Sequence, residues 1–178
     1  MEFNILYAIQ AMHSAFLDNI ILAITNVMGN YGQIWLLVSL VLLIPKKTRK
    51  AGICIISSYI LIFLIGQYGL KDLIARPRPC HIDETVTLLV KRPGSYSCPS
   101  THSAWAFAAA TSIYCYHKRA GIAVGVIAII IGFSRLYLFV HFPTDVLIGA
   151  VMGIVLAIIC AMGINRISDK ITKTKACI

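Results

Sequence analysis

The sequence is poor in charged residues, and acidic residues are the scarcest of them. Only 13% of the 178 residues are Asp, Glu, Lys or Arg, and Asp and Glu together number 7. A soluble domain of this length usually has about a quarter of its residues charged. Because 58% of the residues are hydrophobic and the mean hydropathy is +0.81, the composition excludes a soluble domain and indicates an integral membrane protein.

The chain also lacks the residue clusters that hold metal ions. Its few acidic residues are too dispersed for a magnesium site, and its six cysteines show no zinc-type pair. We therefore expect no metal and no cofactor. Cys80 and Cys98 flank the long polar loop, where they form either a disulfide, in an oxidising compartment, or two free thiols. The other central cysteines lie in apolar runs, typical of small buried hydrophobic residues: Cys54, Cys115 and Cys160.

The net charge of +9 does not indicate a nucleic-acid partner, because no aromatic-basic RNA motif or soluble basic domain is present. The cations instead predict topology. Ten of the sixteen fall at one set of helix ends: Lys46, Lys47, Arg49, Lys50, Lys118, Arg119, Arg166, Lys170, Lys173 and Lys175. The positive-inside rule places these basic loops and the C-terminus in the cytoplasm, and the loop from Arg76 to Ser100 outside.

Apolar runs of about the length that crosses a hydrocarbon core recur along the chain. They predict helices at residues 30–44, 51–70, 101–116, 120–140 and 146–164. A further membrane helix at residues 17–28 is separated from the first of these by glycine-containing residues 29–32. We therefore predict an all-α fold, a polytopic bundle of five or six membrane helices. With no internal repeat or composition shift, residues 1–178 are expected to form a single domain.

The first sixteen residues lack the basic leading region and small-residue ending of a secretory signal, so we retain them as part of the protein. Their apolar residues fall at roughly helical spacing between polar Asn4, Gln10 and His13. This pattern predicts an amphipathic helix lying at the membrane interface.

Cationic side chains gather where the helix at 51–70 is expected to end. Lys71 and Arg78 are seven residues apart, about two helical turns, and share a face if the helix continues. Pro77 and Pro79 favour a helix end here. Cations held together repel unless an anion lies between them, and Arg135 adds a fork suited to phosphate oxygens. Each cation taken alone is explained as well by snorkelling toward lipid headgroups.

A second polar cluster, Pro99-Ser100-Thr101-His102, lies at the start of the helix expected at 101–116. Free backbone N–H groups and the helix dipole favour an anion at such a place, and Ser100 and Thr101 add hydroxyl donors. A lone histidine here is more often a capping or interfacial residue, so this cluster alone leaves both interpretations open.

A third cluster contains His141 and Asp145, four residues apart, with Pro143 expected to start the last helix. The carboxylate can reach back to one imidazole nitrogen, which would fix the tautomer and raise the basicity of the other nitrogen. The alternative is that Asp145 only caps the helix.

Together the three clusters resemble the motifs of the type 2 phosphatidic acid phosphatase superfamily, K-x6-R-P, P-S-G-H and S-R-x5-H-x3-D. In the same order and spacing, this chain reads Lys71-x6-Arg78-Pro79, Pro99-Ser100-Thr101-His102 and Ser134-Arg135-x5-His141-x3-Asp145. The motif region covers residues 71–145, and the helical outline extends the likeness over nearly the whole chain. One position departs from the family: Thr101 replaces the usual glycine, and either narrows the phosphate pocket or donates a hydrogen bond.

The resemblance implies a metal-independent phosphatase that works through a phosphohistidine. His141, oriented by Asp145, would attack phosphorus, and His102 would protonate the leaving oxygen. The resemblance further implies a set of phosphate-binding residues: Lys71, Arg78, Ser100, Thr101 and Arg135. Three residues would support this site: Pro79, Pro99 and Ser134.

The implied partner is a phosphorylated lipid in the cell membrane, with the site on the non-cytoplasmic face and no obligate protein partner. The small size is similar to that of bacterial members acting on undecaprenyl pyrophosphate, phosphatidylglycerol phosphate or lipid A phosphate. We rank undecaprenyl pyrophosphate first, since an outward site fits recycling of that carrier, and keep phosphatidylglycerol phosphate, phosphatidic acid and lipid A phosphate as alternatives.

Three other classes remain to be tested. Thr101 motivates a lipid-binding or lipid-translocating protein without turnover. A metal-dependent hydrolase built on Cys80, His81, Cys98 and His102 is disfavoured by the spacing of these residues. A haloperoxidase shares the phosphate motif, but membrane embedding argues against it. The motif spacing selects Arg78, so we expect Arg76 on the rim of the site; whether residues 91–93 touch the substrate is left open.

Overall fold

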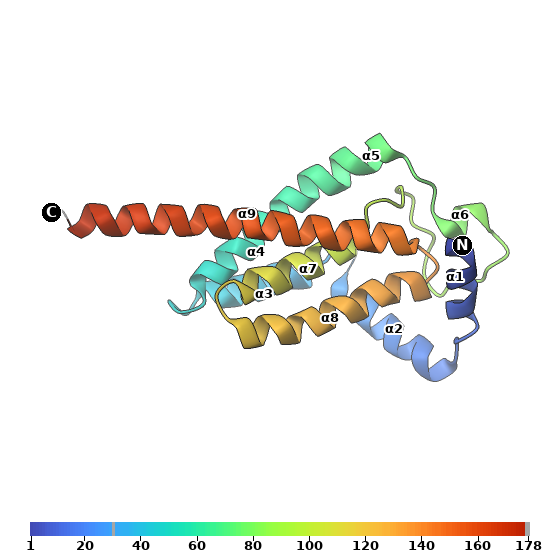
Figure 1. Ribbon diagram of the computed structural model, residues 1–178. Helices are drawn as coiled ribbons and strands as arrows, with labels where there is room; N and C mark the ends of the chain where they lie inside the picture. The colour runs from blue at the N-terminus through green and yellow to red at the C-terminus, as the bar shows by residue number, and fades with distance from the viewer. Residues whose placement is uncertain (30, 177–178) are drawn as a thin grey trace.

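The computed structural model of the chain describes residues 1–29 and 31–176, and the regular structure within these ranges is helical (Figure 1). Along the chain the helices are α1 (Glu2–Gln10), α2 (Ala15–Met28), α3 (Ile34–Leu43), α4 (Arg49–Leu61), the π-helix η1 (Ile62–Leu70), α5 (Lys71–Ile74), α6 (Pro79–Ile82), α7 (Thr101–Tyr114), α8 (Lys118–Tyr137) and α9 (Pro143–Ala176). The all-α membrane bundle predicted from the sequence is confirmed.

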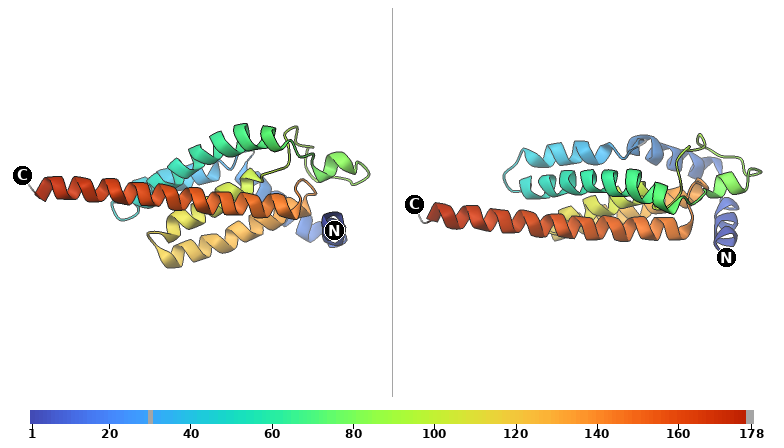
Figure 2. Two further views of the ribbon diagram at one scale, coloured as in Figure 1. Left: turned by 45° about the horizontal axis from the view of Figure 1, so that its top comes forward. Right: turned by 90° about the horizontal axis from the view of Figure 1, so that it is seen from above.

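Three helical segments are long and apolar enough to cross a membrane: Arg49–Ile82, Lys118–Tyr137 and Pro143–Thr174. α1 and α2 pass the same test only as a pair bent by 114°, and α3 is a shorter apolar helix. In both views of Figure 2, α1 lies across the end of the bundle while the longer helices run along it. This position fits the interfacial helix expected for the N-terminus, and the total of five or six membrane helices stays a prediction.

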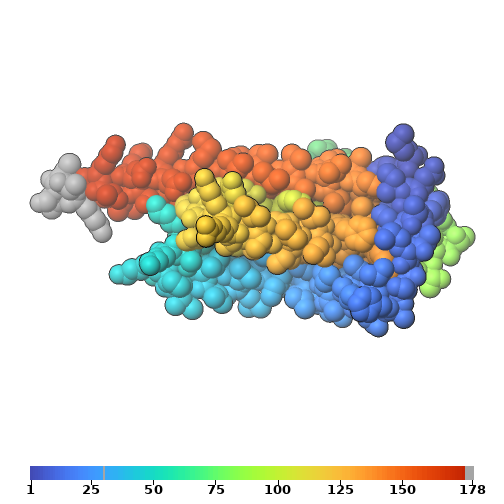
Figure 3. Space-filling view, turned by 60° about the horizontal axis from the view of Figure 1, so that its bottom comes forward, coloured from blue at the N-terminus to red at the C-terminus, as the bar shows by residue number. Residues whose placement is uncertain are grey.

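Two helix ends differ from the expectation. The N-terminal helix stops at Gln10, and Phe16 belongs to α2, which begins after Ser14 accepts a hydrogen bond from the Leu17 N–H. α9 continues to Ala176, well past residue 164, where the last helix was predicted to end. The added turns contain no glycine or proline, and the Asp169 and Lys173 spacing of four favours a helix. In Figure 3 this end of α9 projects beyond the rest of the molecule.

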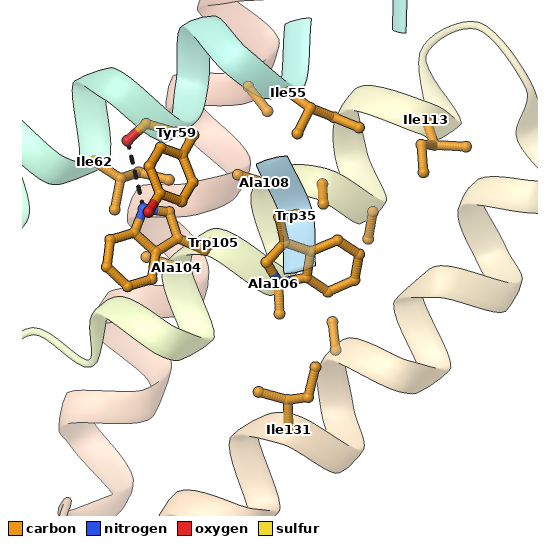
Figure 4. Packing of buried hydrophobic residues seen from close by; sticks show 14 of the residues in the cluster. Trp35, Ile55, Tyr59, Ile62, Ala104, Trp105, Ala106, Ala108, Ile113 and Ile131 are labelled. Atoms are coloured by element: carbon orange, nitrogen blue, oxygen red, sulfur yellow. Dashed lines mark hydrogen bonds between the residues drawn. The ribbon is translucent and has the colours of Figure 1, made fainter. Parts of the chain in front are cut away.

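Helix α7 occupies the centre of the bundle because its small side chains let neighbouring helices approach closely. It packs mainly on α8 and α9, and its alanines from Ala104 to Ala110 are buried. Figure 4 shows Trp105 of α7 stacked on Tyr59 of α4, with ring centroids 5.0 Å apart, and its N–H donating to the Tyr59 carbonyl. The start of α7, which carries the Pro99-to-His102 cluster, is thereby fixed at one end of the bundle.

Glycines on α9 make the contact with α7 possible. A Cβ at Gly153 would lie 2.2 Å from the Ala104 carbonyl oxygen, whereas one at Gly163, on the same helix, would meet nothing within 4 Å. We therefore expect Gly153→Ala to lower the free energy of unfolding by about 1–3 kcal/mol through overpacking. Gly163→Ala is the matched control and should leave it unchanged or raise it by up to about 1 kcal/mol. Thermal unfolding in detergent measures both, and equal melting temperatures for the two variants would contradict the close approach.

Candidate active site

A cavity of about 1020 Å³ opens at the end of the bundle that carries α1 and the long loop before α7. It brings together six residues from the three sequence clusters: Lys71, Arg78, Thr101, His102, Arg135 and His141. The ten basic residues assigned to the cytoplasm lie in segments at the other end, around the α3–α4 and α7–α8 turns and the end of α9. The chemistry-bearing clusters therefore converge at one end of the molecule.

The cavity holds three buried cations that lack acidic partners. Lys71, Arg78 and Arg135 are each no more than 4% exposed, and among the described residues none of them pairs with a carboxylate. Lys71 Nζ instead lies 3.4 Å from Ser95 Oγ, and Arg135 Nη2 donates to Thr25 Oγ1 at 2.7 Å. Buried charges are normally paired, so three uncompensated cations around one cavity indicate a site for an anion.

Arg78 also indicates which nitrogen of His141 carries the lone pair. Its Nη1 donates to the Val140 carbonyl at 2.8 Å and lies 3.1 Å from His141 Nε2. Because a guanidinium has no acceptor, Nε2 must accept this bond and carry its lone pair toward the cavity. The remaining donors of Arg78 bind the carbonyls of Ser95 and Tyr96, and α5 has already ended at Ala75, as the prolines predict.

Asp145 lies on the other side of the His141 ring. Its Oδ2 is 3.8 Å from His141 Nδ1, beyond hydrogen-bond distance, and Nδ1 has no other partner among the described residues. The same oxygen accepts the Phe142 N–H at 2.8 Å and the Ser97 hydroxyl. Asp145 therefore caps the start of α9 as the alternative predicted, and it also faces the imidazole, although the expected hydrogen bond to Nδ1 is not made in this structure. Burial lowers the pKa of His141 and keeps its ring neutral at pH 7.

His102 faces the cavity from the first turn of α7. Its Nε2 lies 3.0 Å from the Gly29 carbonyl oxygen and must donate there, which leaves Nδ1 available. Ser100 is fully buried and is not among the cavity-lining residues: its Oγ lies 3.0 Å from Ser103 Oγ, and its N–H donates to the Asp145 carbonyl. The expected contact of the Ser100 hydroxyl with phosphate is therefore not prepared in this structure.

Thr101 is accommodated by the neighbouring π-helix. Its Oγ1 lies 3.4 Å from Gln67 Oε1, and its methyl group packs where Gly66 has no side chain. π-Helical turns often occur at functional sites, and η1 places Gly66 beside this β-branched side chain. The supporting residues are buried as expected: Pro79 and Pro99 are fully enclosed, and Ser134 Oγ accepts from Arg135 Nε at 3.1 Å.

The structure corrects the position expected for Arg76. Arg76 does not line the cavity. It lies on the side of Asp145 away from His141, where its Nη1 donates to Asp145 Oδ1 at 2.7 Å. Sequence reasoning also missed Ser95, Ser97 and Gln67, which hold the motif residues in place. These are uncharged residues outside the motif positions, and no signal in the sequence marks them. Lys91, Arg92 and Pro93, left open above, do line the cavity.

The two cysteines that flank the loop are free thiols. Cys80 and Cys98 are both buried, and burial raises the pKa of the Cys98 thiol. Across residues 1–29 and 31–176, no three His, Cys, Asp or Glu side chains come together in a way that could hold a metal ion.

This fold is that of a membrane protein of the PAP2 superfamily, to which the chain belongs: the family model matches residues 48–168, more than half of the chain. The chain is 32% identical over 129 residues to an undecaprenyl-diphosphatase of Sulfolobus acidocaldarius, covering 71% of this chain but only 62% of that protein. It is 25% identical over 165 residues to a lipid A 4'-phosphatase of Bacteroides thetaiotaomicron, covering 86% and 72% of the two chains. The crystal structure of a phosphatidylglycerolphosphate phosphatase from Bacillus subtilis superposes with a TM-score of 0.72 at 26% identity, covering 94% of this chain and 84% of that one.

Proposed function

We propose that the protein is a membrane lipid phosphatase that releases phosphate through a phosphohistidine on His141. The observation that carries this proposal is the group of three buried cations without carboxylate partners around the cavity that His102 and His141 face. Such a cavity binds a phosphate group through charge-assisted hydrogen bonds, and two histidines on it supply a nucleophile and an acid.

The proposed reaction has two steps. When the substrate binds, its phosphate group displaces Arg78 Nη1 from His141 Nε2. The Nε2 lone pair then attacks phosphorus and forms an N–P bond while the bond to the leaving oxygen breaks. His102, doubly protonated when the substrate is bound, gives its Nδ1 proton to that oxygen while Nε2–H stays on the Gly29 carbonyl, and in the second step Nδ1 takes a proton from the attacking water. Water then attacks the phosphohistidine, which releases inorganic phosphate and restores His141. Lys71, Arg78 and Arg135 neutralise the charge that develops on the phosphoryl oxygens in both steps.

The lipid we propose first is undecaprenyl pyrophosphate. Two further cations, Lys91 and Arg92, line the cavity and offer contacts for a second phosphate group. Apolar side chains of α2 and α3 line it too, among them Leu22, Val27 and Leu37, and give a prenyl chain a route into the bilayer. The archaeal relative's name supports this choice. Phosphatidylglycerol phosphate, phosphatidic acid and lipid A phosphate are the alternatives.

We further propose that the cavity opens on the non-cytoplasmic face. The support is the separation of charge along the bundle, because ten basic residues lie in segments at the end opposite the cavity. Labelling of single cysteines with a membrane-impermeant thiol reagent in intact cells tests this assignment, with a residue of the 83–95 loop expected to react and one at residues 46–48 expected to stay protected.

The function is tested by phosphate release from purified protein in detergent with excess chelator. The panel is undecaprenyl pyrophosphate, phosphatidylglycerol phosphate, phosphatidic acid and lipid A, each assayed beside the His141→Ala variant. Release that depends on His141 supports the phosphatase, and the kcat/KM values rank the substrates. No release from any lipid would overturn the proposal and favour the lipid-binding or lipid-translocating alternative.

Thr101 should contribute a hydrogen bond to the phosphate. Thr101 lines the cavity, and its hydroxyl would turn from Gln67 to the phosphate, so Thr101→Gly is expected to weaken competitive inhibition by inorganic phosphate by about three- to tenfold, the effect of one net hydrogen bond. Thr101→Ser keeps the hydroxyl and is the matched control. Tighter inhibition in Thr101→Gly would show instead that the side chain narrows the pocket.

A further inference from the structure

Arg76 is the centre of a network that joins the N-terminal helix to the catalytic pair. Its Nη1 donates to Asp145 Oδ1 at 2.7 Å and to Thr144 Oγ1 at 2.6 Å, and its Nη2 donates to Glu2 Oε2 at 2.5 Å. The guanidinium carbon lies 4.1 Å from the centroid of the Phe142 ring. Two hydrogen bonds return from Thr144 to Glu2 Oε1, from the hydroxyl at 2.7 Å and from the backbone N–H at 3.2 Å.

This network satisfies the side of Asp145 that does not face His141. The Asp145 side chain is fully buried, and its Oδ1 has Arg76 as its cationic partner, while its Oδ2 accepts from Ser97 and Phe142 and faces the imidazole. The orientation of the carboxylate is therefore fixed from behind by Arg76. Without Glu2, the charges of Arg76 and Asp145 would cancel, and His141 would face no net negative charge. Glu2 restores it.

We propose that Arg76 and Glu2 are a positioning pair, which fixes the Asp145 carboxylate against His141 and sets the net charge behind the nucleophile. Helix α1 is then a working part of the active site, although none of its residues lines the cavity. The inference rests on the proposed phosphatase function. It differs from the role expected of Arg78, which touches the phosphate, because Arg76 acts only through Asp145.

The charges around His141 predict that substitutions of Glu2 and Arg76 change the protonation of His141 in opposite directions. On the cavity side the ring faces Arg78 and Lys71, with His102 and Arg135 lining the same space. On the other side lie Asp145 and, behind it, Arg76 and Glu2. Glu2→Gln removes a negative charge and should make His141 harder to protonate. Arg76→Gln removes a positive charge and should make it easier to protonate.

The experiment measures kcat and KM against pH for the parent, Glu2→Gln, Arg76→Gln and the double variant, with one lipid substrate and a C-terminal tag. We expect kcat to fall about tenfold in each single variant, with KM changed less than about twofold, because neither residue touches the phosphate. The acid limb of kcat/KM should move to lower pH in Glu2→Gln and to higher pH in Arg76→Gln, by about 0.3 to 1 pH unit. The double variant should return toward the parent limb.

The matched control is Tyr7→Phe, which removes the 2.7 Å hydrogen bond from α1 to Asp83 without touching the network, and should keep the parent limb. Loss of activity in Arg76→Gln with an unmoved limb would show a merely structural role and overturn the inference. So would parent-like kcat in Glu2→Gln. An inactive parent would instead refute the proposed function, so the two failures are distinguishable. Arg76→Lys, which keeps the charge, provides the rescue if Arg76→Gln does not fold.

Discussion

Replacing His141 with alanine is expected to lower kcat for phosphate release by at least about a thousandfold, because in the proposed reaction it removes the atom that forms the covalent bond to phosphorus. His141 is 3% exposed, Arg78 holds its Nε2 toward the cavity, and Asp145 lies on the other side of the ring. Among the described residues, the other histidine that lines the cavity is His102. His102 has no carboxylate partner in the part of the chain that the structure describes, whereas His141 faces Asp145, so the proposed reaction gives His102 the role of the acid.

The proposed phosphohistidine allows a second test of this prediction, because the intermediate can be trapped on the protein. With substrate labelled on the transferred phosphorus, rapid acid-free quenching of the parent should trap label on the protein as a base-stable, acid-labile phosphoramidate, and His141→Ala should trap none. Thermal unfolding of the variant serves as the folding control. Residual activity within tenfold of the parent, in a folded variant, would contradict the role of His141.

Much of this site could be predicted from the sequence because its chemistry depends on residue types that are rare in a membrane chain. Lys71, Arg78 and Arg135 stand out since ionisable residues among apolar helices are energetically costly, and the structure brings all three to one cavity. The spacing of His141 and Asp145 likewise predicted that they would face each other across the start of α9. The roles assigned to these residues stay predictions.

The parts that could not be predicted depend on contacts between distant segments. Glu2 and Arg76 are separated by 74 residues, and nothing in either local sequence indicates that they meet beside Asp145. The spacing of the family motif favoured Arg78 and left Arg76 as a rim cation, which was wrong. Ser97 binds Asp145 from a loop whose path is set by Arg78 and by the Arg76 carbonyl, which accepts the Ser97 N–H. Such positions follow from tertiary packing and not from local propensity.

The bounds of the helices likewise include some that could be predicted from the sequence and some that could not. The start of α7 at Thr101 and the approximate ends of α8 agree with the apolar pattern, because burial in the bundle determines both. The long extension of α9 was missed, because the last helix was predicted only as far as its apolar run extends, to residue 164. A helix that begins inside a membrane bundle needs no new nucleation to continue outward, so a following segment without glycine or proline can extend it.

Arg78→Lys is expected to lower kcat/KM by about a hundred- to a thousandfold, the usual effect of losing one preorganised donor to the transition state. Lysine keeps the charge but cannot hold the loop and the phosphate together. Arg78 donates at once to the carbonyls of Ser95, Tyr96 and Val140. KM should rise as well as kcat fall, because Arg78 lines the cavity and is proposed to contact the phosphate before the reaction as well as in the transition state.

This combined change separates Arg78 from Arg76, for which kcat alone should fall. Competitive inhibition by inorganic phosphate provides a reading independent of turnover, and it should weaken in Arg78→Lys and stay near the parent value in Arg76→Lys. Equal loss of phosphate affinity in the two variants would show that both arginines touch the anion. Unchanged affinity for inorganic phosphate in Arg78→Lys would show that the Arg78 guanidinium does not bind the phosphate. Because Arg78 also accounts for the lone pair on His141 Nε2 facing the cavity, that outcome would weaken the case for His141 as the nucleophile.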